Sequence, residues 1–242
     1  MLDALLWGAI SGSAVLIGAI VGVFVKIKKR IIGFIMSFGT GVLIGAACFE
    51  LLIDSIKEGG LVSTSIGFLL GALLFTIVDL VISKKGGKDR KRSRKNPENH
   101  TGLAIFFGSI FDTIPESIVI GVSLLDQSSV SYLLVIAIFI SNFPEGLSSS
   151  VGLKKDGYSN KKILFLWVMV LALSSLSSFS GYALLHHASD MIVGGIGAFA
   201  AGAVVSMVSS TMMPEAFEEG GPTVGFVTAL GLLFSLILSN LQ

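Results

Sequence analysis

The 242-residue sequence has little charge, one cysteine and three histidines. Charged residues make up 14% of the chain and hydrophobic residues 52%, and the mean hydropathy is +0.86. The single cysteine, Cys48, excludes an intramolecular disulfide. No His-Glu-x-x-His or ATP-binding motif is present, which argues against a zinc hydrolase and against direct coupling to ATP. We therefore expect no enzyme, no cofactor and no nucleic-acid partner, although the net charge of +1 by itself says nothing about nucleic acid.

What the sequence does have is a series of long, predominantly apolar stretches. Each has about 18 residues or more, enough to cross a hydrocarbon core of about 30 Å at about 1.5 Å per residue. Six of these stretches contain no charged residue, and two more contain a polar motif. The sequence therefore predicts an all-α, polytopic membrane protein with eight transmembrane helices. They are expected at residues 5–25, 31–49, 61–78, 102–125, 132–153, 163–185, 191–213 and 224–241.

The basic residues are concentrated in three connections between these stretches. Sixteen of the 17 Lys and Arg residues fall within residues 26–30, 84–95 and 154–162. These are the first, third and fifth connections, so the positive-inside rule places them on the cytoplasmic side and both termini outside. The run at residues 84–100 is interpreted as an orientation signal attracted to anionic membrane lipid, with a regulatory or metal-sensing role as the alternative.

Two parts of the chain are similar to each other at an offset of 161 residues. The expected spans at 31–49 and 191–213 cross the membrane in opposite directions, so the similarity is that of an inverted repeat. A single transmembrane domain in an inverted 3+2+3 arrangement follows, a layout typical of secondary transporters. Its parts are a first repeat at 1–83, the basic loop at 84–100, two motif helices at 101–153 and a second repeat at 162–242. The aligned residues are Phe38, Gly41, Asp54, Glu58, Gly59 and Gly60 with Phe199, Gly202, Glu215, Glu219, Gly220 and Gly221.

One short motif occurs twice, near the middle of the spans at 102–125 and 132–153. It reads Asp112-Thr113-Ile114-Pro115-Glu116-Ser117 in the first and Ser141-Asn142-Phe143-Pro144-Glu145-Gly146 in the second. A carboxylate near the bilayer centre costs about 2.5–3.5 kcal/mol on insertion scales, so it marks a functional site by default. Each proline also leaves the carbonyl four residues earlier, that of Phe111 or Ile140, without its helical hydrogen bond.

The two copies of the motif place their polar side chains on matching helix faces. Asp112 and Glu116 are four residues apart and Asn142 and Glu145 three, so each pair shares a face. If these faces pack together, three carboxylates, one amide, two hydroxyls and the freed carbonyls converge. Buried anions repel each other unless a cation or protons neutralise them. The pattern predicts a divalent-cation site, with a protonated, hydrogen-bonded glutamate as the structural alternative.

Other acidic residues lie closer to the ends of the expected spans. Glu50, Asp54 and Asp79 are expected to face water or partners rather than a metal. Glu215, Glu218 and Glu219 are expected at the cytoplasmic exit, with a secondary ion site there as the less favoured alternative.

With these motifs, the chain resembles the ZIP family of divalent-metal transporters along essentially its whole length. Residues 142–146, Asn-Phe-Pro-Glu-Gly, are similar to the family's His-Asn-x-Pro-Glu-Gly, and residues 213–216, Met-Pro-Glu-Ala, to its Pro-Glu-Ala sequence. The resemblance implies transport of a divalent metal towards the cytoplasm by alternating access, through a site between the fourth and fifth helices. Carried over onto this chain, the metal positions are Asp112, Thr113, Glu116, Ser141, Asn142 and Glu145.

The chain departs from the family pattern at the positions that usually hold histidine. These are Asp112 and Ser141 here, and Thr113 replaces an asparagine. An all-oxygen site suits Mg²⁺, Mn²⁺ or Fe²⁺ better than Zn²⁺. We expect a transporter of an ion of the zinc, manganese, iron or magnesium class in a bacterial plasma membrane. The alternatives are a carrier or exchanger of another substrate whose carboxylates relay protons and a metal sensor that does not transport. The candidate partners are the metal ion, membrane lipid and a second copy of the chain in a homodimer.

Overall fold

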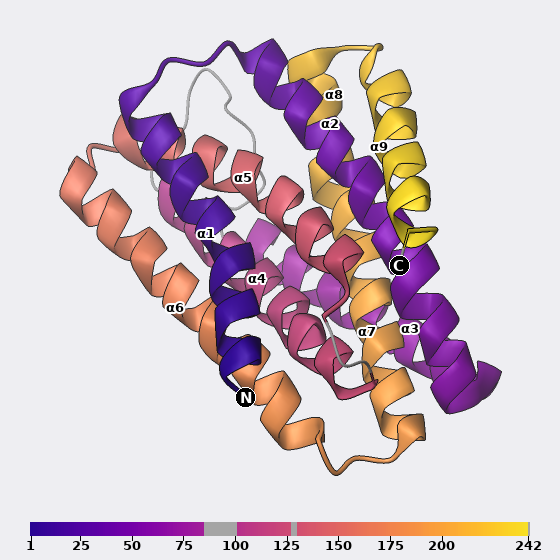
Figure 1. Cartoon of the computed structure of the whole chain (residues 1–242). Coiled ribbons are helices and arrows are strands. Elements are labelled where there is room, and N and C mark those ends of the chain that lie inside the picture. Colours follow the sequence, from indigo (N-terminus) through magenta and orange to yellow (C-terminus); the bar gives the residue numbers. More distant parts are fainter. Residues whose placement is uncertain (85–100, 127–129, 242) are drawn as a thin grey trace.

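The structure, a computed structural model, describes residues 1–84, 101–126 and 130–241, and every regular element in these ranges is helical (Figure 1). The expected all-α class is thereby confirmed. The prediction for the basic loop falls, from residue 85 onwards, outside the described residues. The elements are α1 (Leu2–Phe24), α2 (Lys29–Ala46), the π-helical η1 (Ala47–Leu52), α3 (Ile53–Lys84), α4 (Thr101–Asp126), α5 (Tyr132–Lys155), α6 (Asn160–Leu185), α7 (Asp190–Met207), the π-helical η3 (Val208–Met212), α8 (Met213–Gly220) and α9 (Val224–Ser239).

Six helical stretches of the described chain are long and apolar enough to cross a membrane, judged by length and composition. The chain is therefore an integral membrane protein, as its composition predicts. The stretches differ from the eight expected spans in two places. The spans expected at 31–49 and 61–78 lie in one continuous helical stretch, Lys29–Val81, and α9 has only 16 residues. The number of eight spans therefore stays a prediction.

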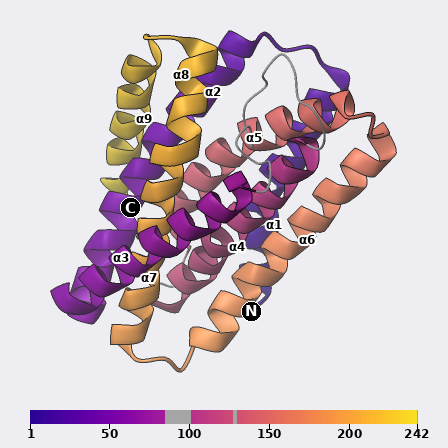
Figure 2. The same cartoon turned by 180° about the vertical axis from the view of Figure 1, so that it is seen from behind.

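A single glycine redirects the long stretch Lys29–Val81. Gly60 has φ 72° and ψ 169°, a conformation that glycine adopts without strain. A straight helix of these 53 residues would measure about 80 Å, more than twice the thickness of a hydrocarbon core. The chain instead turns back after Gly60, so that α2 descends on the right of Figure 1 and most of α3 runs back across the bundle behind α7, in the foreground of Figure 2.

Unusual backbone features recur at the same offset of 161 residues as the sequence similarity. The π-helical segments η1 and η3 begin at Ala47 and Val208. The left-handed glycines Gly60 and Gly221 have φ of 72° and 76°. Both features are uncommon, because a π-turn interrupts the normal helical hydrogen-bond pattern and a positive φ suits glycine. The similarity between the two halves therefore extends from sequence to backbone conformation.

The helices form two groups, which we call the first and the second group. The first consists of α1, α4, α5 and α6, and the second of α2, α3, α7, α8 and α9, on the right of Figure 1. Glycines allow close backbone contact within the second group. A Cβ added to Gly231 of α9 would collide with the Phe38 carbonyl of α2, and one added to Gly71 of α3 with the Phe199 carbonyl of α7. Small residues commonly permit such approach in membrane helices.

The two groups meet along the motif helices. α5 packs against α2, and α4 packs against α7. The larger apolar core lies at this junction and includes Met36 and Leu43 of α2, Ile138 of α5 and Ala200 of α7. The fold therefore places α4 and α5 inside the bundle, as the helices of the first group that contact the second group.

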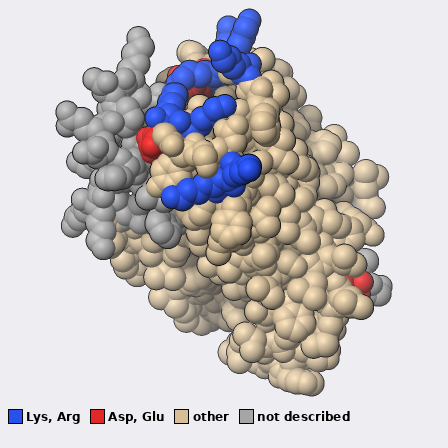
Figure 3. Space-filling model, turned by 90° about the vertical axis from the view of Figure 1, so that its left-hand side faces the viewer, with Lys and Arg blue, Asp and Glu red and all other residues tan. Residues whose placement is uncertain are grey.

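Basic side chains gather at one end of the molecule. The α1–α2 and α5–α6 connections lie together at the upper left of Figure 1, and they carry Lys26, Lys28, Lys29 and Arg30 on one side and residues 154–162 on the other. Figure 3 shows the blue Lys and Arg side chains at the same end. We call this the basic end, and the opposite end of α5, at Ser131, the acidic end.

Candidate metal centre

The duplicated motif lies on two helices that pack against each other, α4 and α5. All six predicted positions are buried, with exposed fractions of 1–4%. The structure therefore brings every one of them into the protein interior, between the two helix groups. On α4 these are Asp112, Thr113 and Glu116, and on α5 they are Ser141, Asn142 and Glu145.

Neither proline of the motif ends its helix. Pro115 lies within α4 and Pro144 within α5, although each removes one backbone hydrogen bond. The carbonyl of Ile140, four residues before Pro144, lies against Gly39 of α2, where an added Cβ would be 3.2 Å from the oxygen. Gly39 thus allows α2 to approach the freed carbonyl closely. The freed carbonyl therefore faces the protein backbone of the second group.

The two hydroxyls of the motif donate to their own helices. Thr113 Oγ1 donates to the Ser109 carbonyl at 2.7 Å, and Ser141 Oγ to the Ile138 carbonyl at 3.0 Å. A hydroxyl oxygen has two lone pairs, which remain available for a cation when its proton is engaged in this way. Both residues can therefore act as neutral oxygen ligands without first losing a proton.

Asn142 supplies the amide of the motif. Its Nδ2 is buried and has no hydrogen-bond partner in the part of the chain that the structure describes. A half-turn about the last side-chain bond places the oxygen Oδ1 at the same position. A cation bound to that oxygen would relieve the cost of leaving a buried polar group unpaired, about 1–3 kcal/mol.

Three carboxyl groups accompany these neutral groups into the interior. Asp112, Glu116 and Glu145 are 2%, 4% and 3% exposed, and charges this deeply buried require a counter-charge or protons. Within the described ranges, however, no three His, Cys, Asp or Glu side chains are gathered closely enough to hold a metal ion. Their convergence on one ion stays a prediction.

A cavity of about 330 Å³ lies at the acidic end. Its charged lining comes from Glu50 of η1 and from Asp54, Lys57 and Glu58 of α3. Lys57 pairs with Asp54 at 2.8 Å, three residues away on the same helix. Two more carboxylates than ammonium groups line the cavity, so it favours cations over anions.

Three apolar side chains separate this cavity from the motif. Leu51, Val119 and Leu134 line the cavity and also a void of about 10 Å³ that touches Glu116. A void of that size holds at most about one water molecule. In this conformation the motif is therefore closed towards the acidic end by an apolar barrier.

Two glutamates that the sequence analysis did not place in the metal site accept hydrogen bonds from serines at the start of α5 and within it. Glu50 Oε2 accepts a hydrogen bond from Ser131 Oγ at 2.9 Å, and Glu215 Oε1 accepts one from Ser148 Oγ at 3.0 Å. Glu215 is only 3% exposed, although we expected it at an open exit. The sequence contained one indication that Ser148 lies near the site: it follows Glu145 by three residues and so shares its helix face.

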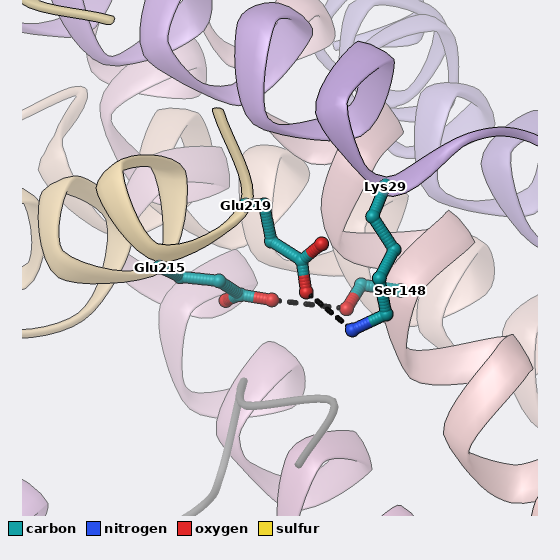
Figure 4. Close-up of polar contacts among 4 residues, drawn as sticks. All are labelled: Lys29, Ser148, Glu215 and Glu219. Atoms are coloured by element: carbon teal, nitrogen blue, oxygen red, sulfur yellow. Dashed lines mark hydrogen bonds and ion pairs between the residues drawn. The ribbon is translucent and has the colours of Figure 1, made fainter. Parts of the chain in front are cut away.

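The region around Glu215 joins three elements at the basic end. Glu215 and Glu219 are one turn apart on α8, and Lys29 of α2 pairs with Glu219 Oε1 at 2.8 Å. Figure 4 shows both carboxylates pointing towards Ser148 and Lys29. The side chain of Lys29 is 57% exposed and that of Glu219 12%. This ion pair therefore lies near the surface, next to the buried Glu215.

Comparison with known proteins adds a family match. A family model described as ZIP Zinc transporter matches residues 83–238, a range that includes both motif copies. The Arabidopsis thaliana protein "Putative zinc transporter At3g08650" is 25% identical over 209 residues, which are 86% of this chain and 33% of that protein. The Dictyostelium discoideum "Protein zntB" is 27% identical over 103 residues, 42% of this chain and 27% of that protein. The chain thus spans about a third of the length of these relatives or less.

Proposed function

Because the chain belongs to the ZIP zinc transporter family, we propose that it moves a divalent metal ion across a membrane towards the cytoplasm by alternating access. Members of this family are transporters rather than enzymes. The proposed metal ligands are Asp112, Glu116, Asn142 and Glu145, with Thr113 and Ser141 assisting. The ion is the transported substrate, and the proposal requires no cofactor.

The observation that carries this proposal is the burial of both motif copies between the two helix groups. Each copy brings a glutamate, a second polar side chain and a hydroxyl into a membrane-spanning bundle, at an exposure of 4% or less. Burial of ionisable groups in such a position has a high free-energy cost, and such groups mark ion or proton pathways. The oxygen ligands belong to helices of the first group, which contact the second group. This arrangement suits alternating access, in which one group moves relative to the other around the ion site.

The ligand set bears on which metal is carried. All six proposed positions supply oxygen, and no histidine or cysteine is among them. Hard cations such as Mn²⁺, Mg²⁺ and Fe²⁺ prefer oxygen, whereas imidazole and thiolate favour Zn²⁺. The name of the Arabidopsis relative refers to zinc. We propose a transporter of this metal class whose ion ranking is shifted towards the harder ions.

The proposed architecture is an inverted repeat of 3+2+3 helices with eight membrane crossings. The matching π-helical segments and left-handed glycines support it, as does the change of direction at Gly60, which divides Lys29–Val81 into two crossings. The domain is a single unit, with repeats at 1–83 and 162–242 around the motif helices at 101–153.

The proposed sidedness follows from the basic end. Lys and Arg are retained on the cytoplasmic side of a membrane, so the basic end faces the cytoplasm, and the acidic end with its cavity faces outwards. Both ends of the chain then lie outside, in a bacterial plasma membrane. The outer cavity, with more carboxylates than ammonium groups, suits the capture of a cation before transport.

Uptake into proteoliposomes tests the proposal. Glu116→Gln and Glu145→Gln keep the size of each side chain and remove its charge, so each should abolish uptake of Mn²⁺ and Zn²⁺. Asp190→Asn is a matched control, because Asp190 is an exposed residue in the first turn of α7, away from the motif. Unchanged uptake in both glutamate variants, with correctly folded protein, would disprove the proposal.

The buried carboxylates also suit a proton relay, which is the competing function. A metal that binds the folded protein raises its stability by RT ln(1 + [L]/Kd), whereas a proton relay gains little from added metal. We expect Mn²⁺ at about 100 times its Kd to stabilise the protein by about 2.7 kcal/mol, and Glu116→Gln to remove this effect. Equal melting temperatures with and without metal would favour the proton relay.

A further inference from the structure

We propose that two serine–glutamate hydrogen bonds act as latches that hold the metal centre closed at both ends. The outer latch is the bond from Ser131 to Glu50, and the inner latch the bond from Ser148 to Glu215. The inference rests on the proposed function, because it assigns residues that control access to the same centre.

Both hydrogen bonds join one helix group to the other. Ser131 is the N-cap residue of α5 and Ser148 lies within α5, in the first group. Glu50 lies in η1, between α2 and α3, and Glu215 in α8, both in the second group. The latches therefore connect the two bodies that have to move relative to each other in alternating access.

Two other long-range side-chain hydrogen bonds each stay within one group. In the first group, Ser174 of α6 donates to the Gly8 carbonyl of α1 at 2.8 Å. In the second group, Ser63 of α3 donates to the Met191 carbonyl of α7 at 2.9 Å. Such bonds stiffen each group without opposing movement between the groups, which distinguishes them from the latches.

The two latches lie on opposite sides of the metal centre along α5. Ser131 lines the outer cavity together with Leu134, one of the three side chains of the apolar barrier. Ser148 lies one turn beyond Glu145 towards the basic end, on the same helix face. Movement at Ser148 therefore changes the packing next to Glu145, and movement at Ser131 changes the packing of the apolar barrier on the other side of the centre.

The chemistry of each latch makes it responsive to the ion. A hydroxyl bonded to a carboxylate forms a charge-assisted hydrogen bond, stronger than one to a neutral acceptor. A divalent cation prefers the same carboxylate oxygens. An ion that reaches Glu50 or Glu215 therefore competes with the serine for the carboxylate and loosens the connection between the groups at that end.

At the inner end, α8 has a second attachment that stays within its own group. The pair of Lys29 with Glu219, at 2.8 Å, connects α8 to the start of α2 (Figure 4). Loss of the Ser148–Glu215 bond thus releases α5 while α8 remains attached to the second group. The moving element at this latch is α5.

Labelling of a cysteine in the centre tests the latches on the full chain, reconstituted in lipid vesicles. Ser141→Cys places a thiol among the proposed ligands, in a Cys48→Ala background that removes the native thiol. A membrane-impermeant methanethiosulfonate reagent is applied to one side at a time. Ser131→Ala should raise the labelling rate from the acidic end, and Ser148→Ala from the basic end, each by about tenfold, the factor expected for a hydrogen bond to a charged group.

Four variants serve as controls. Ser149→Ala removes a buried hydroxyl that has no hydrogen-bond partner in the described ranges. Ser123→Ala removes one that lines the outer cavity but donates within its own helix, to the Ile120 carbonyl at 2.9 Å. Neither should change labelling. Ser131→Thr and Ser148→Thr keep the hydroxyl and should keep labelling at the low rate, which excludes a general loss of folding as the cause.

The results separate this inference from the proposed function. Labelling rates equal to those of the controls, or increases from both sides for each single variant, would overturn the latches. Metal uptake plays no part in this measurement. If uptake depends on Glu116 and Glu145 while labelling does not respond, the latches fail alone. If labelling responds as expected in a protein that moves no metal, the transport function fails alone.

Discussion

Replacement of Gly231 by alanine tests how the second helix group is held together. A Cβ at this position of α9 would collide with the Phe38 carbonyl oxygen and lie 3.0 Å from its carbon and 3.1 Å from the Val42 nitrogen. All three atoms belong to the backbone of α2, so no side-chain rotation relieves the contact. The two helices must separate, and such overpacking costs about 1–3 kcal/mol.

The same helix offers a control that isolates the packing cost. Gly225, also in α9, has no heavy atom within 4 Å of an added Cβ. Gly231→Ala also gains helix propensity, about 1 kcal/mol in a helix interior, and Gly225→Ala, in the first turn of α9, gains less, so the comparison understates the packing cost. For a protein of this size, a difference of about 1–3 kcal/mol corresponds to a melting temperature about 2–12 °C lower for Gly231→Ala.

Thermal unfolding in detergent measures the difference, followed by the fraction that stays monodisperse in size-exclusion chromatography after heating. Gly225→Ala should melt at or slightly above the temperature of the wild type, and Gly231→Ala clearly below it. Equal melting temperatures for the two variants would refute the reasoning, because α2 and α9 would then not be in backbone contact at this position.

Three further predictions concern other parts of the molecule. Asp112→His adds an imidazole to an all-oxygen centre and should shift uptake towards Zn²⁺ in competition with Mn²⁺; an unchanged ion ranking would show that Asp112 is not a ligand. Gly60→Ala should lower the free energy of unfolding by about 1–3 kcal/mol, because nothing crowds the position but φ 72° with ψ 169° is a conformation essentially confined to glycine. Gly60→Asn should cost as much, and a melting temperature equal to that of the wild type would contradict this backbone requirement. Lys29→Gln removes the partly exposed ion pair with Glu219 and should lower the free energy of unfolding by about 1 kcal/mol at most. Its effect on the melting temperature should shrink at high salt, and a larger effect at high salt would contradict a surface ion pair.

Much of the fold could be predicted because it depends on local properties of the chain. The length and apolarity of the stretches predict membrane helices wherever they occur, and the positions of α4 and α5 follow the predicted spans within a few residues. The apolar pattern did not predict that the connection between the second and third expected spans is also helical. Charges at Asp54 and Lys57 interrupt the apolar run but not the helix, which continues to Gly60 because polar residues are tolerated beyond the hydrocarbon core.

The candidate site was predictable in its residues but not in its surroundings. A repeated Pro-Glu pair in an apolar helix identifies Glu116 and Glu145 without any structure, since buried charge is costly. The partners of Glu50 and Glu215 come from residues 81 and 67 positions away. No periodicity within one helix predicts contacts of that kind.

The sequence by itself determined that this protein is a bundle of membrane helices with two carboxylate motifs at its centre, because hydrophobic length and residue spacing act within single helices. Only the tertiary structure decided which helices form each group, where an apolar barrier closes the centre and which serines connect α5 to the opposite group. Those features depend on the rotation and register of one helix against another. Backbone contacts at glycines such as Gly39 and Gly231 set that register, and they exist only after the helices have packed.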